Sequence, residues 1–373
     1  MNILVPNLGS TSVKYQIIEL PSERSLARGA LQRIGRPGGD AASYRHAIEA
    51  ALNSPHTIDA VGFKAVHAGP RFRGTFPVDD ALLAALREFE PAAPLHNGIY
   101  LSGIEIFREL RPELPLVAVL ETGFHRSVPE KASTYGVPRA WADEHGVRRY
   151  GFHGASHRYI AERLPPFLGR DTGSLRMISC HLGGSSSVCA VAGGESRDVT
   201  MGFSPQSGIE NATRHGDLDA FAVLFMMERL SLSSEQMRQL LLAEGGLAGI
   251  SGVAGGDVRD IEQAAATGDV RAALALDVFT YEIKKTIGAY AAALGGLDAV
   301  AFTGGIGEND ATLRAKVLDG LAFLGLQVDP EANEGGSGDR LISPSGAGVS
   351  VAVLATNEEL VVARESYALL NAS

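Results

Sequence analysis

The chain has 373 residues, a length at which one hydrophobic core usually gives way to two domains with a cleft between them. A hydrophobic content of 45%, with 44 glycines, predicts a folded α/β protein and excludes a disordered one. The formal net charge of −10 disfavours nucleic acid as a partner, because phosphate backbones are bound by basic surfaces.

The first predicted elements are two strands joined by a Gly/Ser turn, over residues 3–15. The chain enters this strand without a basic region or a long apolar stretch, so we expect neither a signal peptide nor a membrane anchor. Two apolar runs, residues 60–66 and 116–120, predict further strands, and residues 82–89 predict a helix between them. Strands that alternate with helices favour parallel or mixed sheets.

A second strand-turn-strand segment, residues 177–189, repeats the layout of residues 3–15. The repetition predicts an internal duplication, with one copy opening each domain. Cys180 and Cys189 flank the second turn, and we expect small buried residues rather than a disulfide or a metal site. That expectation fits a reducing, cytoplasmic setting.

A third glycine-rich segment, residues 303–309, follows a predicted helix over 271–294 and a strand over 299–302. Asn309 is the expected N-cap of a helix over 310–324. Each glycine turn alone is better explained as a tight turn, but three of them favour phosphate binding. The P-loop and dinucleotide-binding motifs are absent, which excludes those two classes.

Residues 148–159 place two histidines and three arginines around two glycines. No clustered cysteine or carboxylate completes a set of metal ligands, so we expect His153 to donate a hydrogen bond to a transferring phosphate. Arg214 has two interpretations, a surface ion pair or a functional cation. The neighbouring Gly216 and Asp217 favour the functional one.

Taken in order, these segments resemble the acetate kinase family, which belongs to the superfamily of sugar kinases, Hsp70 and actin. The resemblance implies an α/β fold of two duplicated actin-like (ribonuclease H-like) ATPase lobes with an interdomain cleft. It implies a first lobe of residues 1–124 with a returning helix at 358–373, and a second lobe of residues 125–357. The matching positions are 7–12, 66–67, 94–97, 122, 124–125, 150–157, 181–183, 201–203, 205, 213–214, 216–217, 305–309 and 356–359.

The resemblance implies that ATP, with Mg²⁺, donates a phosphoryl group reversibly to acetate or a close relative, giving an acyl phosphate. A carboxylate needs no general base, so catalysis rests on alignment and charge neutralisation. The resemblance also implies a homodimer. The implied catalytic residues are Lys64, Glu121, His153 and Arg214, the implied acid-binding residues are Val66, Leu95, His96, Phe152 and Pro205, and the implied magnesium residues are Asn7 and Glu358. The implied nucleotide-binding residues are Ser10, Ser12, Lys14, His181, Gly183, Gly184, Asp257, Arg259, Gly305, Ile306, Gly307, Glu308 and Asn309.

The chain departs from the family pattern at positions that the resemblance assigns to catalysis and substrate binding. Lys64 stands where the family has an arginine, which exchanges a planar fork for a point charge. Glu121 stands where it has an aspartate, and we hypothesise that the shorter base and the longer acid compensate each other. Gly184 replaces an asparagine, as in butyrate kinases, and the acceptor loop at 97–100 differs as well. Two alternatives therefore stay open: a kinase for a different carboxylic acid, and a nucleotide-binding regulatory protein with weakened catalysis.

Overall fold

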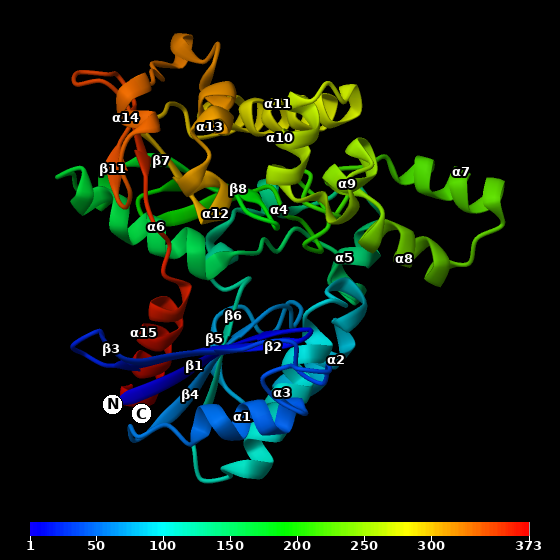
Figure 1. The fold of residues 1–373 in the computed structure, drawn as a ribbon, viewed down its shortest axis with the longest axis vertical. Helices are drawn as coiled ribbons and strands as arrows, with labels where there is room; N and C mark the ends of the chain where they lie inside the picture. Colours follow the sequence, from blue (N-terminus) through cyan, green and yellow to red (C-terminus); the bar gives the residue numbers. More distant parts are fainter. Residues whose placement is uncertain (373) are drawn as a thin grey trace.

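Two six-stranded sheets organise residues 1–372, the part of the chain that this computed structural model describes (Figure 1). The first sheet has the strand order β3-β2-β1-β4-β6-β5, and the second has the order β11-β12-β10-β7-β8-β9. The strands are β1 (Asn2–Gly9), β2 (Ser12–Glu19), β3 (Arg24–Leu31), β4 (Ala60–Ala65), β5 (Thr75–Pro77), β6 (Leu116–Leu120), β7 (Arg176–His181), β8 (Ser187–Ala192), β9 (Glu195–Val199), β10 (Ala299–Thr303), β11 (Arg340–Leu341) and β12 (Ser350–Val353).

The two sheets share one topology, which confirms the predicted duplication. In each sheet the first three strands form an antiparallel meander, β1 to β3 in one and β7 to β9 in the other. Two parallel strands follow beside the first, β4 and β6 or β10 and β12. A short antiparallel strand, β5 or β11, closes the far edge. The predicted α/β fold of two related lobes is therefore confirmed.

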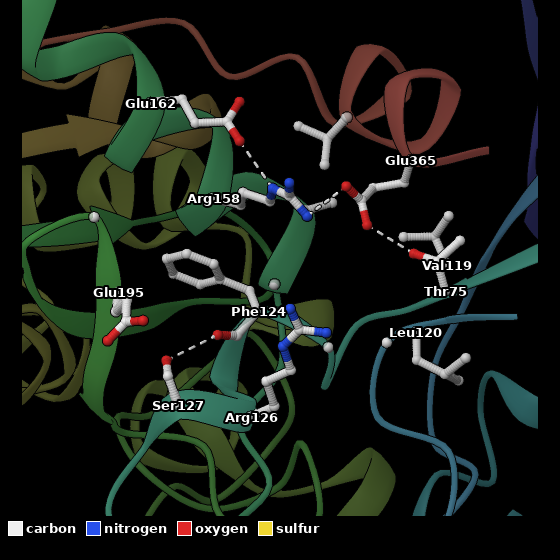
Figure 2. Close-up of a pocket in the computed structure, with 16 residues that line it drawn as sticks. Thr75, Val119, Leu120, Phe124, Arg126, Ser127, Arg158, Glu162, Glu195 and Glu365 are labelled. Carbon is white, nitrogen blue, oxygen red and sulfur yellow. Dashed lines mark hydrogen bonds and ion pairs between the residues drawn. The ribbon is translucent and has the colours of Figure 1, made fainter. Parts of the chain in front are cut away.

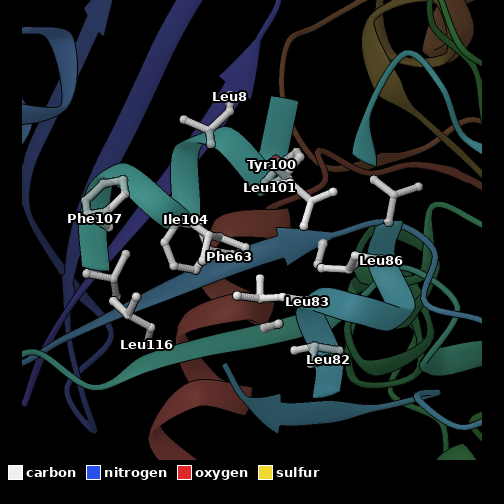
Figure 3. Packing of buried hydrophobic residues seen from close by; sticks show 14 of the residues in the cluster. Leu8, Phe63, Leu82, Leu83, Leu86, Tyr100, Leu101, Ile104, Phe107 and Leu116 are labelled. Atoms are coloured by element: carbon white, nitrogen blue, oxygen red, sulfur yellow. The ribbon is translucent and has the colours of Figure 1, made fainter. Parts of the chain in front are cut away.

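Helices cover both faces of the first sheet, which explains why β6 is apolar throughout and β4 is apolar except for Lys64 near its end. On one face, α1 (Tyr44–Leu52), α2 (Asp80–Glu88) and α3 (Asn97–Leu110) pack against the sheet, and Figure 3 shows Phe63 of β4 against Phe107 of α3. On the other face lies α15 (Glu358–Asn371). The packing of α15 supports the predicted lobe division, which stays a prediction and whose last residue, 373, lies outside the described residues.

The second sheet is covered by α11 (Val270–Ala293) and α13 (Ala311–Leu318) on one face and by α6 (Gly154–Phe167) on the other. The remaining α-helices are α4 (Glu130–Ser133), α5 (Arg139–His145), α7 (Ala220–Leu230), α8 (Ser234–Ala243), α9 (Gly246–Ser251), α10 (Val258–Ala266), α12 (Gly304–Asn309) and α14 (Pro330–Glu334). The 3₁₀ turns are η1 (Glu90–Ala92), η2 (Phe124–Ser127), η3 (Thr172–Ser174), η4 (Ala254–Gly256) and η5 (Ala322–Leu324). Within residues 1–372, none of the helices combines the length and hydrophobicity that crossing a bilayer requires.

The predicted N-cap at Asn309 is wrong. Residues 304–309 already form α12, and the Asn309 side-chain amide donates to the Gly305 carbonyl at 2.8 Å, inside that helix. The N-cap of α13 is Asp310, whose Oδ1 accepts from the Leu313 N–H at 2.8 Å. The cysteine prediction is confirmed, because both thiols are free and buried, Cys180 in the cluster under α11 and Cys189 in the cluster under α6.

Candidate active site

Two neighbouring cavities gather most of the predicted site residues. The smaller cavity, of about 450 Å³, is lined by residues of both lobes. The larger cavity, of about 910 Å³, is lined by residues of the second lobe. The turn after β7 separates them, since Gly183 and Gly184 line the larger cavity and Ser185 lines the smaller one. A group that passes from one cavity to the other passes this turn.

The smaller cavity lies where strands β1, β4 and β6 end, the position at which α/β sheets place their ligands. Asn7 lies near the end of β1, Lys64 near the end of β4, and Glu121 directly after β6. Residues from loops and from the second lobe complete the wall. The predicted residues that line this cavity are Asn7, Ser10, Lys64, Val66, Leu95, His96, Glu121, Phe152, His153, Pro205 and Arg214.

Arg214 is a half-buried cation whose partners are all neutral. Its guanidinium donates to the Ser185 hydroxyl at 2.8 Å and to the Pro205 carbonyl at 3.4 Å, and it lies 3.4 Å from Nε2 of His96. Burial lowers the pKa of Arg214 to about 10. No described carboxylate pairs with it, so the surface ion pair considered for this arginine is absent from residues 1–372.

Lys64 lies between two carboxylates from distant parts of the chain. Its Nζ is 2.5 Å from Oε2 of Glu358, at the start of α15, and 3.6 Å from Oε1 of Glu121. Burial alone would lower the pKa of Lys64, but the charges of Glu358 and Glu121 outweigh it and raise that pKa well above its usual value. Burial raises the pKa of Glu121 to about 7, against the opposing effect of Lys64.

Of the two acids beside Lys64, Glu121 has fewer polar partners than Glu358. Its side chain is only 5% exposed, and neither carboxylate oxygen has a hydrogen-bond partner among the described residues. An acid in this state has both oxygens available for a ligand.

His153 is held at the cavity by an unusual backbone conformation. It precedes α6 with φ of 57°, in the left-handed region that non-glycine residues rarely adopt, and such strain is concentrated at functional sites. The following residue must be glycine, because a Cβ on Gly154 would lie 2.0 Å from the Glu121 carbonyl oxygen. His153 Nδ1 lies 2.8 Å from the Ser187 hydroxyl, and its ring lies beside that of His181, with 4.4 Å between centroids.

Apolar side chains form the remaining wall of the smaller cavity. Of these apolar residues, Val66, Leu95, Phe152 and Pro205 were predicted, whereas Leu8, Ile99 and Tyr100 were not; Gly9 and the polar Ser185 also line the cavity and were not predicted. Ile99 and Tyr100 come from the first turn of α3, and only the altered acceptor loop at 97–100 pointed to them in the sequence. Ser185 belongs to the Gly/Ser turn, where its role depends on the distant Arg214.

The larger cavity contains seven of the predicted nucleotide-binding residues: Gly183, Gly184, Asp257, Arg259, Gly305, Ile306 and Asn309. Asp257 caps α10, accepts from the Arg259 N–H at 3.0 Å and pairs with its guanidinium at 2.6 Å, so the two residues form one charged rim. The side-chain bond to Arg259 lowers the pKa of Asp257 to about 2.

Other predicted residues lie apart from both cavities. Lys14 lines a separate groove with Arg28 and Asn357, and Ser12 and Gly307 line no cavity described here. The carboxylate of Glu308 accepts from the Gly304 N–H at 3.0 Å, a bond within α12. His181 does not line the larger cavity but contacts His153, and its Nδ1 lies 2.7 Å from the Ser156 hydroxyl.

A further cavity of about 230 Å³ contains none of the predicted site residues (Figure 2). Arg158 of α6 pairs there with Glu365 of α15 at 2.7 Å and with Glu162 at 2.8 Å, and Thr75 donates to Glu365 at 2.8 Å. These charges already have partners, whereas Arg214 has no carboxylate partner among the described residues and Glu121 has Lys64 only at 3.6 Å. We therefore assign the chemistry to the two neighbouring cavities.

Comparison with known proteins gives consistent matches over nearly the whole chain. A model described as the acetokinase family matches residues 43–364. The acetate kinase of Heliobacterium modesticaldum is 42% identical, covering 99% of this chain and 100% of the relative, and the propionate kinase of Citrobacter rodentium is 42% identical, covering 97% and 95%. Among solved structures, the acetate kinase of Porphyromonas gingivalis matches with a TM-score of 0.89 and 37% identity, covering 99% of both chains. A propionate kinase from Francisella tularensis matches with a TM-score of 0.89 and 32% identity, covering 98% of both chains.

Proposed function

The chain belongs to the acetate kinase family, and from that premise we propose that it transfers the γ-phosphoryl group of ATP reversibly to the carboxylate of a small organic acid, giving an acyl phosphate. It is a phosphotransferase, with ATP and ADP as its co-substrates. The premise covers both lobes, because the relatives align along nearly their whole length.

The observation that carries the proposal is the guanidinium of Arg214, which lines the smaller cavity and has no carboxylate partner in the described part of the chain. A partly desolvated cation without an anion is unfavourable, so the cavity favours an anionic ligand. Arg214 also contacts Ser185, in the turn between the two cavities. We assign it the neutralisation of charge on the transferring phosphoryl group, with His153 as a hydrogen-bond donor to the same group.

The acceptor side of the site fits a short acyl chain. Val66, Leu95, Phe152 and Pro205 supply an apolar wall beside the charged residues, and His96 lies next to Arg214. Burial lowers the pKa of His96 to about 4, so this imidazole is neutral at pH 7. We expect weak discrimination between acetate and propionate, because one methylene in an apolar pocket is worth about 1–3 kcal/mol.

Lys64 favours a second candidate, a kinase for a different carboxylic acid. Its ammonium is already engaged by Glu358 and Glu121, so it presents a shared point charge to an acceptor carboxylate. An acceptor held in this way is oriented less strictly than one bound by a free guanidinium fork.

The donor side is the larger cavity, whose volume of about 910 Å³ lies within the usual range for ligand pockets. Gly183, Gly184 and Gly305 present open backbone there, and Asp257 and Arg259 form its polar rim. We propose that the nucleotide lies in this cavity with its terminal phosphate directed towards Ser185.

We propose Mg²⁺ as the ion that accompanies ATP. The available donors are oxygens, as Mg²⁺ prefers: the Glu358 carboxylate, the Asn7 amide oxygen, and the two Glu121 oxygens, which have no hydrogen-bond partner among the described residues. Within residues 1–372 no group of three His, Cys, Asp or Glu side chains forms a metal site, which suits an ion held by one or two carboxylates and the substrate phosphates. When bound, the ion supplies positive charge to the phosphate oxygens.

A homodimer is the assembly that we propose. Helix α7 projects from the second lobe (Figure 1) and has no buried residue, although most of its side chains are apolar. Phe221 is 78% exposed and Phe225 is 63% exposed. A second copy of this chain would cover this apolar helix. A cytoplasmic setting and the absence of nucleic-acid partners stay predictions.

The test is acyl phosphate formation, trapped as the hydroxamate, with ATP, magnesium and a panel of acetate, propionate, butyrate and longer acids. Turnover with one or more short acids supports the proposal and names the acceptor. ATP binding without turnover on any acid would instead support the regulatory alternative, and absence of both would reject a kinase.

A further inference from the structure

A chain of buried side chains leads from His153 into the second sheet. Ser187 Oγ lies 2.8 Å from Nδ1 of His153 and 2.8 Å from Nε2 of His157. His157 Nδ1 lies 3.0 Å from the hydroxyl of Ser179. Ser179, Ser187 and His157 are completely buried, so these contacts are shielded from bulk water.

The chain allows two arrangements of its protons, because each hydroxyl has one proton and each neutral imidazole has one. In the first arrangement Ser179 donates to His157 Nδ1, His157 Nε2–H donates to Ser187, and Ser187 donates to His153 Nδ1. His153 then carries its proton on Nε2. In the second arrangement every bond is reversed, and Nε2 of His153 is a bare acceptor.

The buried end of the chain favours the first arrangement. In the first arrangement the Ser179 hydroxyl donates its proton to Nδ1 of His157. In the second arrangement Ser179 accepts from His157, so its own proton needs another acceptor. Among the described residues, His157 is the only hydrogen-bond partner of that hydroxyl. A buried donor without an acceptor is destabilising, so the second arrangement is disfavoured.

Both histidines are neutral in this environment. Burial, followed by the neighbouring histidines, keeps the pKa of His153 and that of His157 well below the usual value for histidine. Nε2 of His153 has no hydrogen-bond partner among the described residues, and His153 lines the smaller cavity. Whether Nε2 of His153 donates or accepts is therefore set by the hydrogen bond that Nδ1 makes with Ser187.

We propose that Ser187, supported by His157 and Ser179, is a positioning residue that holds His153 in the tautomer whose Nε2–H faces the smaller cavity. The inference rests on the proposed function in one respect, that the ligand of this N–H is the transferring phosphoryl group. An anion needs a donor, and the opposite tautomer would present a lone pair to it. The left-handed backbone at His153 fixes where the ring lies, and Ser187 fixes which nitrogen bears the proton.

The first test needs no turnover. In protein labelled with ¹⁵N-histidine, two-bond ¹H–¹⁵N correlations distinguish the two neutral tautomers, and variants at His153 and His157 assign their signals. We expect both rings to carry the proton on Nε2, with Nδ1 as a hydrogen-bond acceptor. A proton on Nδ1 of His153 would overturn the inference, whether or not the protein makes an acyl phosphate.

The second test separates positioning from folding. Ser187→Ala removes the donor to His153, and we expect kcat for acyl phosphate formation to fall about tenfold, with the Kd for ATP unchanged, as for one lost oriented hydrogen bond. Ser179→Ala should lower kcat by a smaller factor, roughly threefold, because it acts through His157. The Nδ1 acceptor signature of His153 should be lost in Ser187→Ala.

Ser196→Ala is the matched control. Ser196 is a fully buried serine whose hydroxyl lies 2.8 Å from Nδ1 of a histidine, His125. The other ring nitrogen of His125 bonds to the Phe152 carbonyl, and among the described residues no hydrogen bond joins Ser196 or the His125 ring to the His153 ring. Its kcat should stay within about twofold of the unsubstituted enzyme. Equal kcat values for Ser187→Ala and Ser196→Ala would overturn the inference. If Ser187→Ala does not fold, the ¹H–¹⁵N measurement of the His153 tautomer in the unsubstituted protein alone tests the inference.

Discussion

The ammonium of Lys64 lies 3.6 Å from a carboxylate oxygen of Glu121, an acid whose oxygens both lack a hydrogen-bond partner within residues 1–372. The same ammonium contacts Glu358 at 2.5 Å, so one cation lies between a buried acid and a partly buried acid that are 237 positions apart in the chain. This arrangement joins the end of β6 to the start of α15, and Lys64 is the one ion-pair partner that either acid has among the described residues.

Replacement of Lys64 with methionine should destabilise the protein. The substitution keeps most of the side-chain volume but leaves two neighbouring acids uncompensated, and breaking a buried ion pair from one side costs about 3–5 kcal/mol. Urea unfolding measures the loss. The double variant Lys64→Met with Glu121→Gln should recover part of it, and a double variant no more stable than Lys64→Met would contradict the pairing.

Lys64→Arg and Glu121→Asp should be coupled in catalysis. Arginine reaches further than lysine and aspartate less far than glutamate, so each single change disturbs the spacing that the other residue sets. We expect each single variant to lose at least about tenfold in kcat/KM, and the double variant to recover part of that loss. Strictly additive effects in a double-mutant cycle would show that the two residues do not compensate each other.

Arg214→Lys should abolish most phosphoryl transfer while ATP still binds. Loss of one donor that acts on transition-state charge typically lowers kcat about 10²–10³-fold, and an ammonium does not replace the fork that contacts Ser185. Single-turnover assays and ATP titration measure the two effects separately. Arg126→Lys is the control, because Arg126 is an exposed arginine beside the cavity of Figure 2. Unchanged kcat in Arg214→Lys would remove Arg214 from the mechanism.

His125 should make the protein less stable in acid. Burial lowers the pKa of His125 to about 4, below the unfolded value of about 6.5, so the unfolded chain takes up a proton first as the pH falls. The contribution of neutral His125 is complete above pH 6.5 and is lost as the pH falls from about 6.5 to about 4, by roughly 1.4 kcal/mol per pH unit.

His125→Gln should therefore flatten the dependence of unfolding free energy on pH in this window. Denaturant unfolding between pH 4 and pH 7 measures it, and the exposed His145→Gln is the control. The prediction fails if the two substitutions change the pH dependence equally.

The apolar face of α7 should be needed for dimer formation. Phe225→Glu places a charge on the proposed interface, and we expect a concentration-dependent shift to monomer in light scattering after size-exclusion chromatography. Phe323→Glu replaces another exposed phenylalanine, 79% exposed, outside α7. A dimer that persists in Phe225→Glu, or a monomer in the unsubstituted protein, would reject this interface.

The local sequence determined much of the scaffold. Continuous apolar runs predicted β4, β6 and β10 to within one residue, because strands covered by helices on both faces have no polar face. The repeated strand-turn-strand pattern predicted the duplication, since each copy contains its own turn chemistry. The family resemblance named Arg214, His153, Lys64 and Glu121, and the structure brings all four to one cavity.

Only the tertiary structure decided how those residues are paired. Lys64 lies against Glu358 because α15 returns to the first sheet, a contact that no local pattern contains. Ser187 lies between His153 and His157 because β8 packs beneath α6, and Asp310 replaced Asn309 as a cap because Asn309 is already bonded within α12. Strand and helix formation depend on near neighbours along the chain, whereas the charge and proton position of a buried group depend on whatever the fold places within a few ångströms of it.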